Sequence, residues 1–407
     1  MPTSIELFTG AGGLALGIHQ AGFEHLAIAE WDKHSVETLR MNRGLLGLAR
    51  IEVERTDVSK VDWTIYAGRV DLVAGGVPCQ PFSLGGQHRG QADNRNLFPE
   101  MLRAVREIAP AAVLIENVKG LVRPSFAPYF RYVTHQLEFP EIGPRTGEDW
   151  WEHDQRLTRE TLGYKRRGSL GYTVRPRLIQ CANYGVPQQR ERVFVVAYRS
   201  DLDLLWEPPP PTHSRRELLR QQYVTKTYWF EHGLTKRGAV QDLKAEIAEI
   251  SGHPQPPDAA RWRTVRDALR GLPKPVKRQF DQHNLLLLCE ACHWGNPGAR
   301  RYHGHEGSLM DWPAKTLKAG VHGVPGGENM LRNPNGTVRY FTAREAARLQ
   351  TFPDDYHFPG SWGETFRQLG NAVPVSVARL IADQIAAAIL ESKSRETAEH
   401  PSLAASG

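Results

Sequence analysis

The sequence has few of the features that mark exported or membrane proteins. It contains 4 cysteines among 407 residues, too few for a disulfide scaffold, which favours a reducing compartment. Residues Met1 to Ser4 carry no basic side chain, so the N-terminus does not resemble a signal peptide. No apolar run reaches the length of a membrane span, and the mean hydropathy is −0.46. We therefore expect a soluble protein that works in the cytoplasm and contacts no membrane.

Charge of one sign is not in large excess either. The chain has 51 Lys and Arg against 45 Asp and Glu, a net charge of +6, and its isoelectric point is near 9.1. This mildly basic balance is compatible with nucleic-acid binding without establishing it. No internal repeat is visible, and the length indicates two or three domains.

The first strong pattern is a strand, a glycine turn and a helix. Ile5 to Phe8 reads as the strand, and Gly10, Gly12 and Gly13 form the turn. Glycines let a ligand approach the backbone, and the start of a helix offers free N–H groups to a carboxylate or phosphate. Glu30 follows about 20 positions later, where an acidic residue can bind ribose hydroxyls. The glycine spacing also fits a dinucleotide site loosely, so a nicotinamide or flavin enzyme and a purely structural turn stay open.

Two further apolar runs end in reactive side chains. Val70 to Val73 leads through a glycine pair to Pro78 and Cys79, and Ala111 to Ile115 leads to Glu116. Buried parallel strands of this kind present their carboxyl ends at one edge of a sheet, where ligands bind. A thiol and a carboxyl there are a candidate nucleophile and acid. An inert buried cysteine and a structural cap are the alternatives.

The middle of the chain offers polar groups that alternate along an extended segment. Gln188, Arg190 and Arg192 precede the apolar run from Val193 to Ala197, and alternation would place all three on one face. Arginine there could bind a carboxylate, a phosphate or a carbonyl oxygen. An ordinary solvated surface explains the pattern equally well.

The composition changes at the proline run Pro208 to Pro211, which indicates a domain boundary. Residues 212–282 combine basic side chains with aromatic ones, as at Tyr228-Trp229 and Arg261-Trp262-Arg263, which suits a nucleic-acid surface or a solvated face. Cys289-x-x-Cys292-His293 fits no common zinc spacing, so loop residues are the favoured interpretation. Thr342 and Glu345 form a capping box at the start of a helix.

Taken together, these residues resemble the DNA cytosine-5 methyltransferases, particularly the compact bacterial modification enzymes. The resemblance covers nearly the whole chain in the family's order, except the stretch of about 200–300. It rests on Phe8-Thr9-Gly10-Ala11-Gly12-Gly13, Pro78-Cys79-Gln80, Glu116-Asn117-Val118 and Gln188-x-Arg190-x-Arg192, with Asn371 and Val373 in the last motif. It implies a doubly wound, Rossmann-like α/β sheet with a smaller inserted target-recognition domain, and it displaces the dinucleotide interpretation.

The resemblance also implies a role for each matching residue. Cys79 would be the nucleophile, Glu116 the acid, and Arg192 the group that holds the base. S-adenosylmethionine would contact Phe8, Gly10, Gly12, Gly13, Glu30, Trp31, Asp57, Val58, Pro78, Leu97, Asn371 and Val373. Within that set Glu30 would bind the ribose, Trp31 would lie beside the adenine, and Asp57 would meet its amino group. Gln80, Asn117, Val118, Gln188 and Arg190 would contact the substrate, and no metal is expected.

The expected organisation is a catalytic domain over residues 1–205, completed by 365–392. A target-recognition domain would span 206–335, a hinge 336–364, and a disordered tail 393–407. The expected partners are double-stranded DNA and a cognate restriction endonuclease, with the protein acting as a monomer. A tRNA cytosine-5 methyltransferase and a catalytically silent DNA-binding regulator are the alternatives.

Overall fold

The computed structural model describes residues 1–78, 96–162, 169–235, 243–252, 259–277, 293–319 and 329–399. It divides into two compact units. Unit 1 comprises Met1–Ile179, Glu191–Pro208 and Ala378–Gly407, and unit 2 comprises Gln180–Arg190 and Pro209–Val377. The expected boundaries differ from these units, because residues 180–190 and 336–377 all belong to unit 2.

Unit 1 is built on a six-stranded sheet with the strand order β2-β1-β3-β4-β7-β5. The strands are β1 (Thr3–Leu7), β2 (Glu24–Ala29), β3 (Leu72–Gly76), β4 (Ala112–Val118), β5 (Tyr172–Gln180) and β7 (Glu191–Arg199). The first four are parallel, and β7 runs antiparallel to β4. β2 lies on one side of β1, and the next strand in the sequence, β3, lies on the other side. The direction in which strands are added to the sheet therefore reverses between β1 and β3. In doubly wound sheets, ligands bind at this point.

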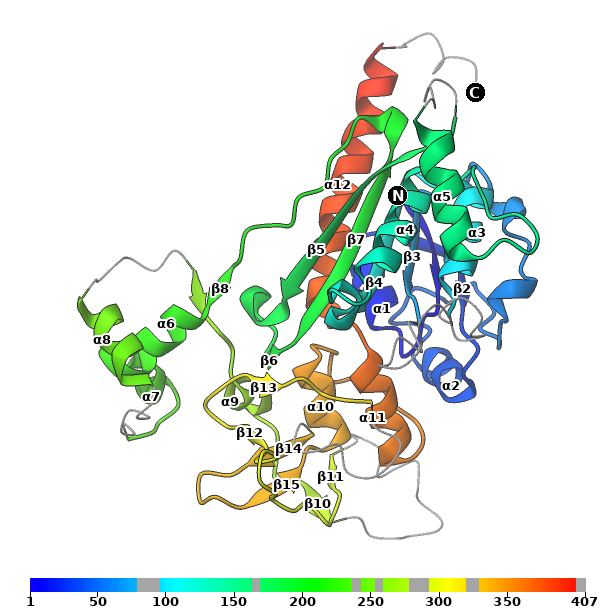
Figure 1. The fold of residues 1–407 in the computed structure, drawn as a ribbon. Coiled ribbons are helices and arrows are strands. Elements are labelled where there is room, and N and C mark those ends of the chain that lie inside the picture. The colour runs from blue at the N-terminus through cyan, green and yellow to red at the C-terminus, as the bar shows by residue number, and fades with distance from the viewer. Residues whose placement is uncertain are drawn as a thin grey trace, which may run out of the picture. The chain divides into compact units, whose positions relative to one another are not determined.

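Three helices pack on one face of the sheet, which Figure 1 shows beside the central strands. They are α3 (Phe98–Ile108), α4 (Ala127–Glu138) and α5 (Trp150–Thr161). Alternate residues of the strands, among them Ile5, Val73 and Val113, share one buried apolar cluster with α3 and α4. This period-two burial is what fixes the register of each strand.

On the opposite face, α1 (Gly13–Gln20) packs tightly against α12 (Val375–Glu399). A Cβ added at Gly17 would lie 2.5 Å from Ala378 Cβ, so the two helices approach as closely as glycine permits. The segment Trp362–Arg395 is long and apolar enough to cross a membrane by length and composition alone, but 56% of its most apolar window is buried inside the structure. The core helix of a globular fold has the same properties.

A buried histidine links β2 to its neighbours without carrying charge. His25 lies 3.0 Å from Ser4 Oγ through Nδ1 and 3.0 Å from the carbonyl oxygen of Ala15 through Nε2. Because a carbonyl only accepts, Nε2 carries the hydrogen and Nδ1 accepts from the Ser4 hydroxyl. Burial lowers the pKa of His25 to about 4.

This histidine predicts a loss of stability in mild acid. Folding suppresses protonation of His25 between its unfolded pKa near 6.5 and about 4, so stability falls as the pH drops through that window. Between pH 7 and pH 5 the loss should be about 2 kcal/mol. Urea unfolding should show that the His25→Gln variant loses less free energy of unfolding between pH 7 and pH 5 than the wild type does. The exposed control His303→Gln should lose as much as the wild type. An unchanged pH dependence in His25→Gln would rule out this origin.

Unit 2 consists of short strands and helices. Its paired strands are β6 (Gln188–Gln189) with β13 (Ala314–Lys315), β8 (His213–Ser214) with β9 (Ala260–Arg261), β10 (Val276–Lys277) with β11 (Trp294–Gly295), and β12 (Ser308–Leu309) with β14 (Met330–Arg332) and β15 (Val338–Tyr340). Its helices are α6 (Arg215–Leu219), α7 (Thr227–Glu231), α8 (Lys244–Gly252), α9 (Val265–Leu269), α10 (Ala343–Leu349) and α11 (Trp362–Asn371). The helix α2 (Lys33–Met41) belongs to unit 1.

The C-terminal part corrects two expectations. The capping box that starts α10 is confirmed, since Thr342 N–H donates to Glu345 and Glu345 N–H donates to Thr342. However, the run from Gln368 to Pro374 predicts the start of one final helix, whereas Gln368 lies within α11 and a separate helix, α12, starts after Pro374, because proline cannot continue a helix. α12 runs to Glu399, so the tail expected to be disordered from residue 393 begins as helix.

Candidate active site and cofactor site

The turn after β1 has an unusual backbone. Phe8, Gly10 and Gly12 all have positive φ, at 57°, 56° and 78°. Glycine adopts this region without strain, whereas a phenylalanine there is strained, a feature that clusters at functional sites. Gly13 begins α1 directly after the turn. The N–H groups of Thr9 and Gly12 donate to the carbonyl oxygens of Ala29 and Thr9, so the turn is held in this conformation by its own hydrogen bonds.

Glu30 closes the turn from the end of β2. Its Oε2 accepts a hydrogen bond from Gly10 N–H at 2.6 Å, and its Oε1 accepts from Asp32 N–H at 2.7 Å. Burial raises the pKa of Glu30, and hydrogen bonds from the backbone N–H groups of Asp32, Gly10 and Trp31 oppose that shift. Each carboxylate oxygen can still accept a second bond. Glu30 is thus fixed as an acceptor beside the glycine turn.

Three more expected cofactor residues lie on the neighbouring segment. The Trp31 side chain is 59% exposed. Asp57 caps the 3₁₀-helix η1 (Val58–Lys60), and its Oδ1 accepts from Ser59 Oγ at 2.7 Å. This bond lowers the pKa of Asp57. Val58 is buried. Glu30 pairs with Arg55 as an isolated parallel bridge, so Glu30, Trp31 and Asp57 lie on adjacent chain segments.

Sequence reasoning missed one buried acid in this region. Glu6 on β1 is 1% exposed, and neither of its carboxyl oxygens has a hydrogen-bond partner in the described part of the chain. Burial, and next the charge of Glu30, raise the pKa of Glu6 well above its usual value. A strand residue between Ile5 and Leu7 gives no sign of this, because alternation alone cannot distinguish a buried second face from a solvated one.

The carboxyl ends of β3 and β4 and the start of β7 form the second group. Gly76 pairs with Glu116, and Val118 pairs with Arg192. Glu116 Oε1 lies 2.8 Å from Arg192 Nε, and both side chains are buried, at 8% and 9% exposure. An isolated charge at this depth would be costly, so the ion pair holds both groups in place. The structure therefore brings together two of the three expected catalytic residues.

Asn117 ties the β3 end to the same edge. Its Nδ2 donates to the carbonyl oxygen of Val77 at 3.0 Å, and its Oδ1 accepts from Val118 N–H at 2.9 Å. Val118 is 48% exposed, and Pro78 is also exposed. Cys79 and Gln80 lie outside the described residues. Asn117 fixes the strand end that leads, through Pro78, to them.

The remaining expected cofactor residues are spread over both units. Leu97 precedes α3 and packs against the main cluster of unit 1. Asn371 ends α11 of unit 2 as an exposed residue, and Val373 is buried nearby in the sequence.

Gln188 and Arg190 are fully buried in unit 2. Arg190 donates to the carbonyl oxygens of Leu317 at 3.2 Å, Gly370 at 2.8 Å and Ala372 at 2.8 Å. Gln188 accepts from Leu317 N–H at 2.9 Å and donates toward Leu349. Both therefore bind protein groups, while Arg192, the third residue of the alternation, points into the unit 1 pair.

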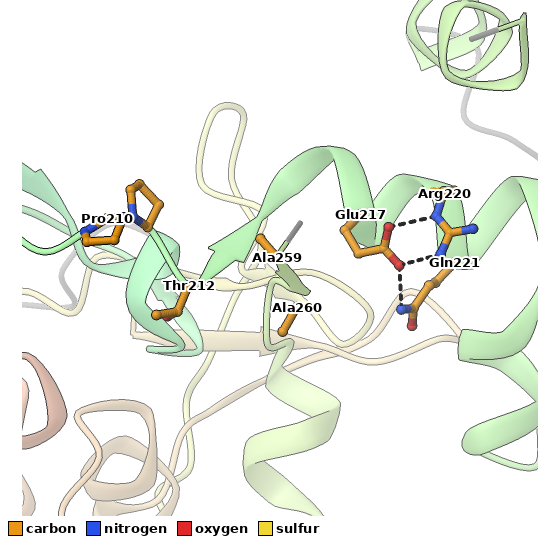
Figure 2. Close-up of a pocket in the computed structure, with 8 residues that line it drawn as sticks. Pro210, Thr212, Glu217, Arg220, Gln221, Ala259 and Ala260 are labelled. Atoms are coloured by element: carbon orange, nitrogen blue, oxygen red, sulfur yellow. Dashed lines mark hydrogen bonds and ion pairs between the residues drawn. The ribbon is translucent and has the colours of Figure 1, made fainter. Parts of the chain in front are cut away.

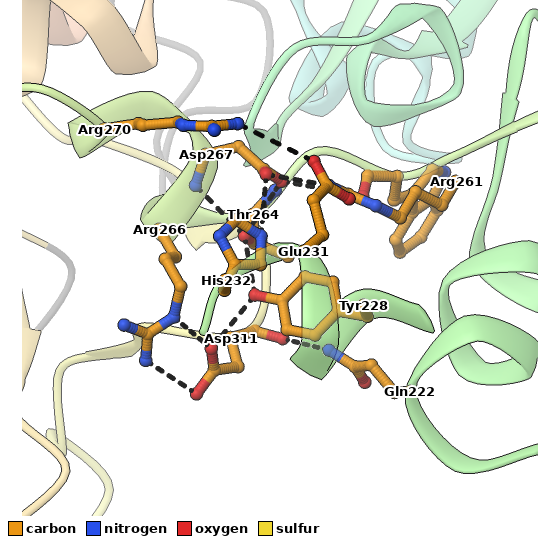
Figure 3. Close-up of polar contacts among 11 residues, drawn as sticks. Gln222, Tyr228, Glu231, His232, Arg261, Thr264, Arg266, Asp267, Arg270 and Asp311 are labelled. Carbon is orange, nitrogen blue, oxygen red and sulfur yellow. Dashed lines mark hydrogen bonds and ion pairs between the residues drawn. The ribbon is translucent and has the colours of Figure 1, made fainter. Parts of the chain in front are cut away.

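The aromatic and basic stretch of unit 2 is not the open surface that its composition suggests. Tyr228, Trp229 and Trp262 form a buried cluster with Leu218 and Ala182. The basic side chains among them are largely neutralised by carboxylates, as Figure 3 shows around Asp267 and Asp311. The pairs are Arg215–Glu246, Arg216–Glu249, Arg220–Glu217, Arg261–Asp267, Arg261–Glu231 and Arg266–Asp311. These residues pair within unit 2, whereas Lys226 and Arg263 are exposed.

A pocket of about 720 Å³ opens beside α6. Figure 2 shows that its charged residues face each other, with Arg220 donating to Glu217 at 2.7 Å and Gln221 donating to the same carboxylate at 2.7 Å. The rest of the lining includes Pro210, Thr212, Ala259 and Ala260. It therefore presents little net charge to a nucleic acid.

Histidine and carboxylate clusters of unit 2 are engaged by protein groups. His293, weighed above as a metal ligand, lies 2.8 Å from Thr342 Oγ1 and 2.8 Å from the carbonyl oxygen of Pro273, so both ring nitrogens are used. Glu231, His232 and Asp267 have donor atoms within 4.8 Å of one another, but Arg261 pairs with both carboxylates. Cys289 and Cys292 lie outside the described residues.

The sheet, with a glycine turn after β1 and an acid–arginine pair where β4 ends and β7 begins, belongs to the doubly wound α/β class, which binds ligands at the carboxyl ends of its strands. The profile of the C-5 cytosine-specific DNA methylase family matches residues 3–141 and 153–387. The chain belongs to this family, and it is a DNA cytosine-5 methyltransferase of the restriction-modification type. Membership implies S-adenosylmethionine as the methyl donor and DNA as the substrate. The fold and function expected from the sequence are confirmed.

Individual relatives agree along most of their length. The chain is 33% identical over 385 residues to the Type II methyltransferase M.PspPI of Psychrobacter sp. (strain TA137), covering 94% of this chain and 78% of the relative. It is 31% identical over 387 residues to M.NgoMIV of Neisseria gonorrhoeae, covering 95% and 98%. The crystal structure of the S. pombe Dnmt2 methyltransferase shares the fold at a TM-score of 0.54 and 19% identity, covering 96% of this chain and 99% of that one.

Proposed function

We propose that the chain modifies one cytosine within a specific site of duplex DNA, with Cys79 as nucleophile and Glu116 and Arg192 as the groups that bind the base. The observation that carries this proposal is the buried 2.8 Å pair between Glu116 and Arg192. It lies at the sheet edge where β3 leads to Pro78 and the following Cys79.

The chemistry requires these groups because C5 of cytosine is a poor nucleophile buried in the base stack. The base must first leave the helix, which costs a few kcal/mol. The Cys79 thiolate then adds to C6, so that an electron pair moves toward C5 and charge develops at N3 and O2. Glu116 donates a proton to N3, and Arg192 binds O2. Once C5 has gained the methyl group that the bound cofactor would supply, N3 returns its proton to Glu116 and the C5 proton leaves to a base. The C5–C6 double bond then re-forms and Cys79 departs as thiolate.

N3 and O2 are neighbouring acceptors on one edge of the cytosine ring. Glu116 and Arg192 side chains that already lie within hydrogen-bond distance of each other can therefore reach both atoms of one base. Asn117 supports this arrangement by fixing the carbonyl of Val77. Gln80 and Val118 would complete the base pocket. Gln188 and Arg190 would act by positioning the last turn of α11 rather than by touching the base.

The residues around the glycine turn fit S-adenosylmethionine. Glu30 offers two fixed acceptors for a ribose, Trp31 an exposed aromatic face for a purine, and Asp57 a carboxylate for its amino group. Phe8, Gly10, Gly12 and Gly13 shape the turn, and Val58, Pro78, Leu97, Asn371 and Val373 would complete the site. When bound, the cofactor supplies the methyl group that C5 receives. No metal is required for these steps.

The cofactor site predicts a large effect of Glu30→Gln. An amide would present N–H to one of the two backbone donors, and the charge of the acceptor would be lost. We expect the Kd for S-adenosylhomocysteine, measured by calorimetry, to rise about 10- to 100-fold. The exposed control Glu24→Gln should bind normally. Equal affinity in Glu30→Gln and the wild type would remove Glu30 from the site.

Unit 2 would read the DNA sequence, and a restriction endonuclease cutting the same site would be the partner, with the methyltransferase working as a monomer in the cytoplasm. Incubation with methyl-labelled S-adenosylmethionine and either duplex DNA or tRNA tests the substrate. Label should enter duplex DNA only, and bisulfite sequencing of DNA from expressing cells should show one methylated motif. Label in tRNA alone, or in neither, would contradict the proposal.

A further inference from the structure

Arg55 is ordered by the aromatic residue that follows Glu30. Its guanidinium carbon lies 4.6 Å from the centroid of the Trp31 ring, within the range of a cation–π contact. Its Nε also donates to the carbonyl oxygen of Trp31 at 3.0 Å. The Arg55 side chain therefore contacts Trp31 twice, once at its ring and once at its backbone carbonyl.

The backbone of Arg55 is fixed to the same segment. Glu30 and Arg55 form a parallel bridge, and Thr56 N–H donates to the carbonyl oxygen of Glu30 at 2.8 Å. Asp57 follows two residues later as the cap of η1. Arg55 thus stands between the Glu30–Trp31 segment and Asp57, the two parts of the proposed cofactor site.

An arginine on a protein surface usually points to solvent or pairs with a carboxylate. Arg55 is exposed, and the contacts that its side chain makes in the described part of the chain are with the ring and the carbonyl oxygen of Trp31. Its side chain is ordered instead against an indole that is itself 59% exposed. A guanidinium over one face of the ring covers that face and restricts the rotation of the Trp31 side chain.

We propose that Arg55 is a positioning residue for the cofactor, which holds Trp31 so that the uncovered face of the indole forms one wall for the purine ring. This inference rests on the proposed cofactor site. A fixed ring spares the ligand the entropy of ordering it on binding. The contribution should appear in cofactor affinity and not in the chemical step, because Arg55 touches no reacting atom.

The test is a double-mutant cycle read by binding of S-adenosylhomocysteine. Arg55→Met keeps a long apolar stem without the cation, and Arg50→Met is the matched exposed control. We expect Arg55→Met to weaken binding roughly 3- to 10-fold, Arg55→Lys to weaken it less, and Arg50→Met to leave it unchanged. In a Trp31→Ala background, Arg55→Met should have no further effect. The KM for cofactor should rise in Arg55→Met at constant kcat, with DNA affinity unchanged.

Intrinsic fluorescence supplies a second readout. Because the chain has 10 tryptophans, the contribution of Trp31 is taken as the difference between each protein and its Trp31→Ala counterpart. Arg55→Met should alter the intrinsic emission without lowering the thermal midpoint. Equal affinities of Arg55→Met and the wild type, or an equal loss in the Trp31→Ala background, would overturn the inference. If the wild type itself failed to bind S-adenosylhomocysteine, the proposed cofactor site would be wrong instead.

Discussion

Replacing Glu116 with glutamine is expected to lower kcat about 10²- to 10⁴-fold, the usual contribution of a positioned general acid. The amide keeps the size of the side chain and can still lie beside Arg192, but it cannot deliver a proton to N3. Charge that develops on the ring after Cys79 adds would then stay unneutralised. Single-turnover methylation of duplex DNA at saturating cofactor measures this step directly.

The Glu116→Gln variant should keep its affinity for S-adenosylhomocysteine, because Glu116 lies at the β4 end and not at the glycine turn. Glu52→Gln, an exposed change in the same unit, is the matched control and should be fully active. A Glu116→Gln enzyme that methylates at the wild-type rate would remove the acid role while leaving the cofactor site intact.

Replacing Arg190 with methionine is expected to destabilise the protein by about 3–5 kcal/mol. Arg190 is fully buried, and its guanidinium donates hydrogen bonds to the carbonyl oxygens of Leu317, Gly370 and Ala372. Methionine fills most of the volume but leaves those acceptors without their donor. Arg300→Met, an exposed change in unit 2, should alter stability by less than about 0.5 kcal/mol.

Urea unfolding followed by far-ultraviolet circular dichroism gives both values, and limited proteolysis locates the loss. Cleavage should accelerate within unit 2, where all three acceptors lie. If Arg190→Met unfolded like the wild type but failed to methylate DNA, Arg190 would act on the substrate, as the family motif alone implies.

The sheet of unit 1 could be predicted because its strands are short, apolar and separated by glycine or proline. β3 and β4 are buried on both faces, and such runs have few structural alternatives. The Glu116–Arg192 pair did not follow from the same logic, because β7 runs antiparallel to β4 and brings Arg192 to that edge at its start. Only the family resemblance suggested Arg192 for this place. Helix α5 was missed within a charged stretch, although Asp149 and Glu152 form a capping box that marks its start.

Unit 2 could not be predicted in the same way, because its charges are paired over long sequence separations. Arg215 meets Glu246 and Arg266 meets Asp311, and composition gives no indication of such partners. The same holds for Tyr228 and Trp262, which the aromatic pattern suggested for a nucleic-acid surface and the fold buries. Arg55 was missed because a stacking contact with Trp31 depends on the parallel bridge to Glu30, which no local motif encodes.

The proposed mechanism depends on one covalent step, the addition of Cys79 to a base that Glu116 and Arg192 would hold. Duplex DNA in which the target cytosine carries fluorine at C5 tests it most directly. A base can remove a proton from C5 but cannot remove fluorine as a cation, so the elimination that would release Cys79 is blocked. Intact mass spectrometry should show a stable complex, and peptide mapping should place the link on Cys79, with none in Cys79→Ser. A link through Cys181, Cys289 or Cys292, or no adduct from an enzyme that methylates normal DNA, would contradict the account.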